Sequence, residues 1–312
     1  MKNLPVDQRD FILSLKRFNF KKREYPSRQL FIMVFDGKFF HGGLADRLKG
    51  IVSTFQYCYI NNIEFRIKHT YPFDLSNYLP PNEYDWTLKL SDKISYHLLE
   101  VKYANFIGKS LFKRLIKLNT KKQIHCYANW NAVPELNTYY QTNYQWGELF
   151  KKLFKPTEEL TNLVLDCKSK IGGPYICAVF RFQQLLGDFR EYDYTELENS
   201  KKDELIEKCR QAIINLQNTS DCEKILVTSD SVLFLQNILG LEDVYTFPSK
   251  VVHIDTVEGE SHNVYLKSFF DFYMLSEGIK IYSMGTDLMY KTEFPLYAAQ
   301  LNNIPFERIL IE

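Results

Sequence analysis

The sequence predicts an α/β protein with two Rossmann-like halves, each a mostly parallel sheet with helices packed against it. The chain has 312 residues, and roughly 150 residues make one domain. Short apolar runs alternate with helical patterns along much of the chain, which is typical of parallel sheets. Residues 1–156 carry 25 basic and 13 acidic side chains, whereas residues 157–312 carry 14 and 25. We therefore expect two domains, over residues 1–170 and 171–312, which either have different partners or only differ in the charge of their solvated surfaces.

The composition excludes several classes of protein. Hydrophobic residues make up 45% and charged residues 25% of the chain, as in ordinary globular proteins and unlike disordered or collagen-like chains. The longest apolar run covers residues 30–35, far short of the roughly 20 residues of a membrane span. The N-terminus shows no apolar leader, and no two of the six cysteines lie within nine residues of each other. We expect a cytoplasmic protein with free, mostly buried thiols.

The first half is expected to hold a capped helix, a buried strand, a second helix, a second strand and a basic amphipathic helix, over residues 7–18, 29–35, 44–60, 63–67 and 106–117. The strand prediction rests on a continuously apolar run. The second helix rests on Leu44, Leu48 and Phe55, which recur on one face. Strand, glycine loop, helix and strand together form a βαβ unit. Residues 69–100 are expected to be irregular.

The second half alternates strands and helices more regularly. Strands are expected over residues 175–182, 224–228, 244–247 and 279–283, with a short one near Arg308. Helices are expected over residues 202–216, 231–239, 266–277 and 294–301. This order implies a mostly parallel sheet with helices on both faces.

Ligands of such sheets bind at the carboxyl ends of the strands, so the residues that follow each strand are the first candidates. Arg181 follows the first strand of the second half, and its planar fork suits a diphosphate, although a structural ion pair is the alternative. Ser229 and Asp230 follow the next strand. The Asp230 carboxylate is expected either to accept hydrogen bonds from a ribose or a base, or to cap the following helix.

Two further loops are candidates for binding an anion. Ser283, Gly285 and Thr286 follow another strand of the second half as small residues that open a helix, which makes a nest for an anion. In the first half, His41, Gly42 and Gly43 lead into a helix whose first turn carries Arg47. Paired glycines let a ligand approach the helix N-terminus. The alternative is a tight turn that only packs the helix on the strand.

Motifs that are missing narrow the chemistry. The sequence contains no G-x-S-x-G, no G-x-x-x-x-G-K and no H-E-x-x-H, which argues against lipase-type hydrolases, P-loop NTPases and zinc proteases. It also contains no D-x-D, the motif with which many nucleotide-sugar enzymes hold a divalent cation. If the chain binds a nucleoside diphosphate, positive charge of the protein must replace the metal.

Three stretches together resemble the fucosyltransferase superfamily, which includes the rhizobial nodulation fucosyltransferase, the core α-1,6-fucosyltransferases and the protein O-fucosyltransferases. The stretch HGGLADRLKGI at 41–51 resembles its N-terminal glycine loop. Thr228-Ser229-Asp230 stands where the family has a T-D-D-like turn, and residues 271–283 resemble its D-x-x-x-L-S helix, strand and serine loop. The family's H-x-R strand end is present only as Arg181, because Val179 stands in the histidine position.

The resemblance implies a GT-B type fold, in which two Rossmann-like domains face each other across a cleft. The first domain would bind a glycan acceptor and the second GDP-fucose, without metal or other cofactor, as in an enzyme of polysaccharide biosynthesis. The expected reaction inverts the sugar carbon, while Arg181 stabilises the leaving diphosphate. Asp188 is the first candidate for the base and Glu191 the second. A transferase for another nucleotide sugar and a non-catalytic sugar-binding protein are the alternatives.

The basic first half suggests an anionic partner other than nucleic acid. Lys109, Lys113 and Lys117 form a line at helical spacing with Arg114 beside it. Such a face predicts peripheral contact with an anionic membrane at its inner surface, and a solvated helix face is the alternative. The aromatic stretch over residues 130–146 suits either sugar stacking or core packing. The oligomeric state stays open.

Overall fold

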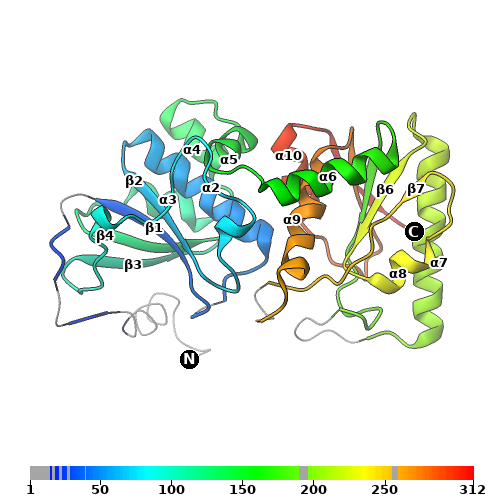
Figure 1. Cartoon of the computed structure of the whole chain (residues 1–312), viewed down its shortest axis with the longest axis horizontal. Coiled ribbons are helices and arrows are strands. Elements are labelled where there is room, and N and C mark those ends of the chain that lie inside the picture. Colours follow the sequence, from blue (N-terminus) through cyan, green and yellow to red (C-terminus); the bar gives the residue numbers. More distant parts are fainter. Residues whose placement is uncertain are drawn as a thin grey trace. The chain divides into compact units, whose positions relative to one another are not determined.

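The computed structural model describes residues 15, 18–20, 23–26, 29–38, 40–189, 196–254 and 259–312. The chain separates into two compact units, Met1–Lys155 and Pro156–Glu312 (Figure 1). The sequence placed this boundary later, between residues 170 and 171. Helix α6 (Glu158–Ile171) belongs to the second unit because it packs on α9 (His262–Ser276). An ion pair between Lys168 Nζ and Glu277 Oε2 at 2.5 Å ties these two helices together.

Unit 1 contains a parallel four-stranded sheet in the order β2-β1-β4-β3. Its strands are β1 (Leu30–Phe35), β2 (Glu64–His69), β3 (Val101–Phe106) and β4 (Gln123–Ala128). Its helices are α2 (Leu44–Ile60), α3 (Ser110–Ile116), α4 (Val133–Tyr140) and α5 (Trp146–Leu153), with 3₁₀ turns η1 (Leu75–Asn77) and η2 (Leu90–Asp92). The predicted first strand, second helix and second strand are confirmed, the helix with the same ends and the strands with ends shifted by up to two residues.

The two faces of the unit 1 sheet differ. The β1→α2→β2 and β3→α3→β4 connections run in the same direction across the sheet, so right-handed crossovers place α2 and α3 on one face. Phe31 packs against Tyr57 of α2 on that face, with ring centroids 5.7 Å apart. The opposite side chains Ile32 and Val34 meet Leu88 of the segment between β2 and β3. Among the described residues, the mostly irregular segment between β2 and β3 therefore packs on this second face.

Two sequence predictions for unit 1 need correction. The basic helix expected over residues 106–117 begins only at Ser110, because Phe106 ends β3 and Gly108 turns the chain with φ +62°. Strand β4 was not predicted, since Gln123 and His125 interrupt its apolar pattern although both are buried. The helix predicted over residues 7–18 lies almost wholly outside the described residues.

Unit 2 contains a parallel five-stranded sheet in the order β7-β6-β5-β8-β9. Its strands are β5 (Ile176–Phe180), β6 (Ile225–Ser229), β7 (Val244–Tyr245), β8 (Ile281–Gly285) and β9 (Phe306–Leu310). Its other helices are α7 (Asn199–Thr219), α8 (Val232–Asn237) and α10 (Phe294–Asn302). The predicted alternation of strands and helices is confirmed, and α6, which precedes it, was not predicted.

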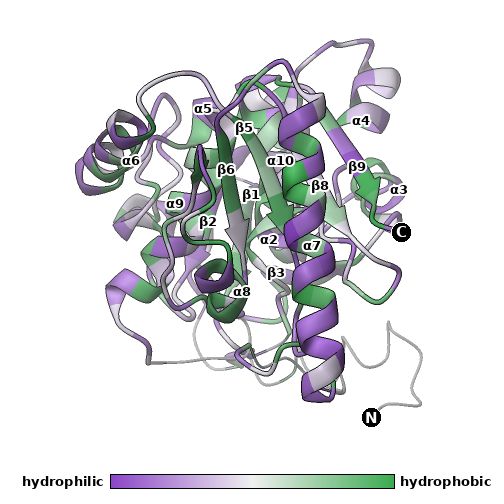
Figure 2. Ribbon diagram, turned by 90° about the vertical axis from the view of Figure 1, so that its right-hand side faces the viewer, coloured by the Kyte–Doolittle hydropathy of each residue, from purple (hydrophilic) through white to green (hydrophobic). Residues whose placement is uncertain are grey.

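The strand order of unit 2 places a topological switch between β5 and β8. The chain moves from β5 through β6 to β7 on one side and returns to β8 and β9 on the other. Figure 1 shows α7 and α8 on one face of this sheet and α9 and α10 on the other. Figure 2 shows β5 and β6 as apolar and α7 as alternately polar and apolar, the pattern of a helix that buries one side.

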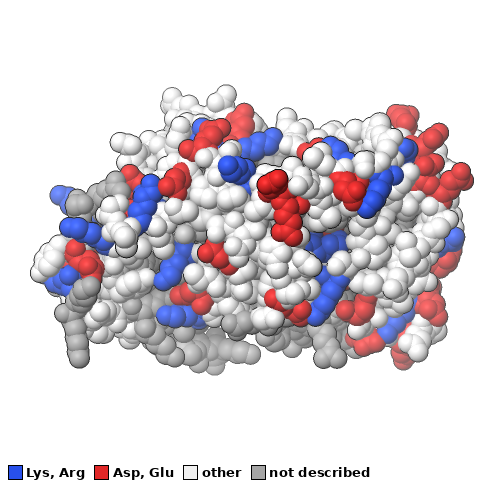
Figure 3. All heavy atoms as spheres, in the orientation of Figure 1, with Lys and Arg blue, Asp and Glu red and all other residues white. Residues whose placement is uncertain are grey.

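The structure also tests the class of protein. All six cysteines are free, and five of them are buried, while Cys222 is half-buried. Within the described ranges, no helix combines the length and apolar character that crossing a membrane requires. The face drawn in Figure 3 carries basic and acidic side chains interspersed, so the opposite charges of the two halves do not form one uniform patch there.

Candidate donor-binding site

The strongest candidate site lies where β5, β6 and β8 of unit 2 end. Phe180 of β5 pairs with Ser229 of β6 on one side and with Met284 of β8 on the other. The residues that follow, Arg181 and Asp230 among them, therefore stand side by side at the carboxyl edge. This edge includes the switch between β5 and β8, where open α/β sheets bind their ligands.

Arg181 and Asp230 form an ion pair at this edge. Arg181 Nη1 lies 3.2 Å from Asp230 Oδ2, and the Asp230 side chain is only 2% exposed. The same carboxylate accepts hydrogen bonds from the backbone N–H groups of Phe182, at 2.8 Å, and Gln183, at 2.7 Å. Burial raises the pKa of Asp230, and Arg181 and the two N–H groups oppose the rise. Both carboxylate oxygens are engaged, so Asp230 positions Arg181 and the turn after β5.

The Arg181 guanidinium keeps a path to solvent. Its side chain is 19% exposed, and its central carbon lies 4.4 Å from the ring centroid of Phe189. Its backbone oxygen accepts a hydrogen bond from Tyr290 N–H at 3.2 Å. A planar cation that is held by a buried carboxylate and is still partly exposed is suited to contact a phosphate group.

Asp188 is bound to the same turn as Arg181. Its Oδ2 accepts hydrogen bonds from Ser231 Oγ at 3.0 Å and from Leu233 N–H at 2.7 Å, at the start of α8. Ser231 caps that helix by accepting from Phe234 N–H at 3.0 Å. The turn between β6 and α8 thus anchors both Arg181, through Asp230, and Asp188. Glu191, the second candidate base, lies outside the described residues.

The loop after β8 differs from its prediction. Ser283 lies inside β8, paired with Val179 and Arg308, and no helix opens at Gly285, because the strand continues to that residue beside β9. The helix-start nest predicted here is wrong. Thr286 follows the strand directly, and its Oγ1 is buried without a hydrogen-bond partner among the described residues. A buried hydroxyl without a partner is costly, so this group is a ready donor for a ligand at the switch.

The glycine loop of unit 1 is a tightly packed turn. Gly42 has φ +69°, and a Cβ there would lie 2.8 Å from Asp46 Oδ2, so a larger residue would strain the backbone and displace the Asp46 side chain. His41 is buried, and its backbone oxygen accepts a hydrogen bond from Tyr127 OH at 2.5 Å. Gly43 caps α2 without a side-chain hydrogen bond, but Asp46, paired with Lys49 at 2.7 Å, already places a carboxylate in the first turn.

Arg47 is used inside unit 1. Its side chain is almost fully buried, and it donates to the backbone oxygens of Gly42, at 3.2 Å, and Tyr71, at 2.7 Å. Its Nη1 also lies 3.0 Å from His69 Nε2, while His69 Nδ1 lies 2.9 Å from Phe73 O. Burial and the nearby Arg47 charge lower the pKa of His69 well below its ordinary value. Arg47 therefore fixes the loops that follow β1 and β2.

Two features of unit 2 were missed from the sequence. Gln183 adopts φ +53°, a left-handed conformation in a non-glycine residue, which forms the tight turn that presents its N–H to Asp230. Lys267 and Asp271 form a buried pair in α9, with Nζ and Oδ2 2.6 Å apart. Their i, i+4 spacing was a readable signal. Within the described residues, no three His, Cys, Asp or Glu side chains gather so as to hold a metal ion.

Comparison with known proteins shows the fold. No family model and no curated protein matches the chain by sequence. A structure of NodZ α-1,6-fucosyltransferase soaked with GDP-fucose matches at 13% identity and a TM-score of 0.54, covering 88% of this chain and 93% of NodZ. A mutant of Arabidopsis thaliana FUT1 in complex with GDP matches at 14% and 0.55, covering 97% and 74%. Fucosyltransferase NodZ from Bradyrhizobium matches at 13% and 0.53, covering 87% and 92%. The chain has the α/β fold of these fucosyltransferases, the GT-B type expected from its sequence.

Proposed function

We propose that this chain is a metal-independent, inverting fucosyltransferase that transfers fucose from GDP-fucose to a glycan hydroxyl. Unit 2 binds the donor and unit 1 the acceptor. The observation that carries the proposal is Arg181, a partly exposed cation at the strand switch of unit 2, held in place by the buried Asp230. The shared fold supports it, because structures of that fold hold GDP or GDP-fucose.

In the proposed reaction, the acceptor oxygen attacks C1 of fucose while the bond from C1 to the β-phosphate oxygen breaks. Negative charge grows on the departing diphosphate, and we assign its stabilisation to Arg181. We assign a hydrogen bond to the same phosphates to Thr286, whose Oγ1 has no partner among the described residues. One such preorganised donor contributes about a hundred- to a thousandfold in rate. No D-x-D is present to hold a divalent cation, which leaves this role to the protein.

The proton of the acceptor hydroxyl passes to a carboxylate. We assign this role to Asp188 first and to Glu191 second. Asp188 is exposed, and α8 fixes one of its oxygens through Ser231 and Leu233. A general base must be held in place to act, and it contributes roughly a hundred- to ten-thousandfold. Because these two hydrogen bonds hold one oxygen, the Asp188 carboxylate has little freedom to move, which suits proton transfer from a bound sugar.

A basic hollow in unit 1 supports a contact with an anionic membrane. The hollow has a volume of about 790 Å³, and the described residues that line it include five cations and no acidic residue: Lys102, Lys113, Arg114, Lys117 and Lys122. Lys109 is separate from this set and lies over the ring of Trp130, with Nζ 5.8 Å from the centroid. Basic groups near an anionic bilayer contribute about 1 kcal/mol each. We therefore assign the peripheral, cytoplasmic-side contact to the hollow and not to one helix face.

Co-sedimentation with vesicles tests this contact. Wild type should bind phosphatidylserine vesicles at low salt and release at high salt. Lys113→Glu together with Lys117→Glu should remove binding, whereas the matched exchange Lys151→Glu on the exposed side of α5 should not. Binding that ignores salt, or that survives the double exchange, contradicts the assignment.

Activity is tested with purified protein, GDP-fucose, a glycan panel and a chelator. The proposal expects fucosylated product whose anomeric configuration, read by NMR, is inverted relative to the donor. Thermal shifts with a panel of nucleotide sugars separate the alternatives, since a ligand stabilises the fold according to its concentration and Kd. A larger shift with another nucleotide sugar favours a different donor. Sugar binding without any nucleotide effect favours a non-catalytic protein.

A further inference from the structure

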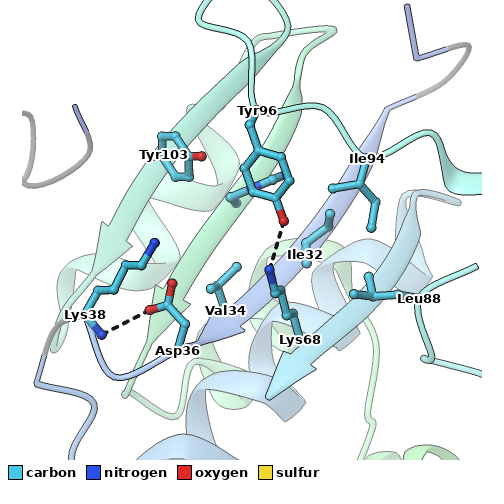
Figure 4. A pocket seen from close by; sticks show the side chains of 10 residues that line it. Ile32, Val34, Asp36, Lys38, Lys68, Leu88, Ile94, Tyr96 and Tyr103 are labelled. Carbon is cyan, nitrogen blue, oxygen red and sulfur yellow. Dashed lines mark hydrogen bonds between the residues drawn. The ribbon is translucent and has the colours of Figure 1, made fainter. Parts of the chain in front are cut away.

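Unit 1 contains a second, smaller cavity on the sheet face that Leu88 and Ile94 cover. Its volume is about 210 Å³, below the roughly 300–1,000 Å³ of sites for drug-sized ligands and near the size of one sugar ring. Figure 4 shows side chains of the sheet on one side of this cavity and those of the segment between β2 and β3 on the other. It lies apart from the candidate donor site, and of its lining residues only Tyr103 also lines the basic hollow.

The sheet register builds the walls of this cavity. Ile32 of β1 pairs with His125 of β4, which in turn pairs with Tyr103 of β3. One row along, Val34 pairs with Lys68 of β2. Because the strands are parallel and in register, these side chains emerge on the same face. The cavity therefore runs along the sheet toward the carboxyl end of β1.

The cavity combines an apolar wall with a mixed polar rim. Ile32 and Val34 from the sheet and Leu88 and Ile94 from the covering segment supply the apolar part. His125 is buried, and the rings of Tyr96 and Tyr103, which also line the cavity, flank it edge-on with centroids 5.4 and 5.3 Å away.

The polar groups gather at the end of β1. Lys68 Nζ donates to Tyr96 OH at 2.9 Å, and Lys38 N–H donates to Asp36 Oδ1 at 3.2 Å (Figure 4). The Asp36 side chain is 15% exposed. A carboxylate, two ammonium groups and a phenol thus surround one opening. The rim therefore carries both donor and acceptor groups, as a polyhydroxylated ligand requires.

This composition discriminates between ligand classes. A simple anion would meet the Asp36 carboxylate, a simple cation would meet Lys38 and Lys68, and a purely apolar ligand would desolvate these charged groups without offering them a new hydrogen bond. A pyranose ring offers an apolar C–H face and a rim of hydroxyl groups that both donate and accept. We propose that this cavity binds one pyranose ring of a glycan. That the glycan is the acceptor rests on the proposed fucosyltransferase function.

Methyl NMR on the full chain reads the cavity directly, because Ile32, Val34, Leu88 and Ile94 carry the reporting methyl groups. The probes are methyl glycosides of glucose, galactose, mannose, N-acetylglucosamine and fucose, titrated one at a time. We expect at least one of them to shift these four sets of methyl signals saturably. Methyl groups of Ile51 and Val52, in α2 on the other sheet face, serve as the internal reference and should not move.

Two variants test the rim. Lys68→Met should raise the Kd of the responding glycoside about tenfold or more, since a charged hydrogen bond is lost, and Asp36→Asn should weaken binding while it keeps the shape of the turn. Lys151→Met, on exposed α5, is the matched control and should bind as wild type does. Unchanged methyl spectra in the reference region confirm that the variants are folded.

The outcomes separate this inference from the proposed function. If no glycoside moves the cavity methyl groups, or if both rim variants bind as wild type does, the inference is wrong even where GDP binds. If a glycoside moves them but GDP leaves every methyl group of unit 2 unchanged, the cavity is a sugar site and the proposed donor is wrong.

Discussion

The two units use an arginine near the end of their first strand in opposite ways. Arg47 of unit 1 is 1% exposed and donates to two backbone oxygens and toward His69. Arg181 of unit 2 has a 19% exposed side chain and pairs with one buried carboxylate. Both arginines were candidates for binding an anion from the sequence, Arg181 directly after a strand and Arg47 in the first turn of the helix that follows a glycine loop. What separates them in the structure is exposure, because Arg47 is buried inside unit 1 whereas the Arg181 side chain stays partly exposed.

This difference has an electrostatic meaning. Arg47 donates to two backbone oxygens and is buried, so its guanidinium presents no surface that a ligand from solvent could contact. Asp230 satisfies one side of Arg181, and its own remaining capacity is filled by Phe182 and Gln183 N–H groups. An arginine that is fixed by a buried carboxylate and stays partly exposed is preorganised for an anion. The expected consequences of substitution therefore differ between catalysis and folding.

The largest effect is expected from Arg181→Ala. Turnover should fall about a thousandfold, close to 4 kcal/mol in transition-state stabilisation, because the leaving diphosphate loses its cation. Steady-state release of GDP measures this. Arg181→Lys keeps a positive charge beside Asp230 but loses the planar fork, so it should be folded and still clearly impaired. Wild-type turnover in a folded Arg181→Ala protein would make the arginine merely structural.

Arg47→Met should act on stability instead. The oxygens of Gly42 and Tyr71 lose their donor inside the unit, which should cost about 3 kcal/mol of the free energy of unfolding. All three tryptophans, Trp86, Trp130 and Trp146, lie in unit 1, so urea unfolding followed by tryptophan fluorescence reports that unit alone. Lys113→Met, on the exposed side of α3, is the control and should be near neutral. If Arg47→Met changes the free energy of unfolding as little as Lys113→Met does, Arg47 is not the structural residue that we infer.

Asp188 carries both a candidate base and a helix contact, and two exchanges separate them. Asp188→Asn keeps an oxygen for Leu233 N–H but removes the base, so turnover should fall about a hundredfold with GDP affinity nearly intact. Asp188→Ala removes the helix contact as well and should cost roughly a further 1 kcal/mol of stability. If Asn and Ala lower stability equally while Asn keeps full turnover, Asp188 only anchors the turn and the base lies elsewhere.

The smallest effect concerns the pH dependence of unit 1. Because burial and Arg47 lower the pKa of His69, the unfolded chain takes up a proton below about pH 6.5 that the folded chain refuses. Stability should therefore decrease as the pH falls from 7 to 5, by up to about 1.4 kcal/mol per pH unit. Tryptophan-detected unfolding over this range should show the slope, and His69→Gln should flatten it. If His69→Gln leaves the pH dependence of stability unchanged, that dependence comes from other groups.

The sequence predicted best where hydrophobic patterns are continuous. Strand β1 and helix α2 show their ends plainly, because a wholly apolar run is followed by a glycine loop and a regular apolar face. Strands β3 and β4 were not predicted, because polar residues interrupt their apolar pattern. In β4, Gln123 and His125 are nevertheless buried, and Gln123 is satisfied by a hydrogen bond from a distant segment. Local patterns carry no information about such long-range burial.

The candidate site was predictable in its members but not in its connections. Strand ends identified Arg181 and Asp230, and the family resemblance added Asp188. Asp230 accepts a hydrogen bond from the turn after β5, and Asp188 accepts one from the start of α8. Both bonds join residues more than 40 positions apart in the sequence. The left-handed Gln183 that completes this arrangement has no sequence signature. Three-dimensional structure was needed to separate positioning residues from the exposed cation.

The central claim, that unit 2 binds the diphosphate of the donor through Arg181, is tested most directly by calorimetric titration of GDP in a chelating buffer. Wild type should bind GDP saturably without divalent metal, and Arg181→Ala should weaken binding by about a hundredfold, as expected for a lost bidentate phosphate contact. Arg210→Ala, on the exposed side of α7 in the same unit, should bind as wild type does. Binding that the chelator abolishes, or that Arg181→Ala retains at wild-type strength, would contradict the claim.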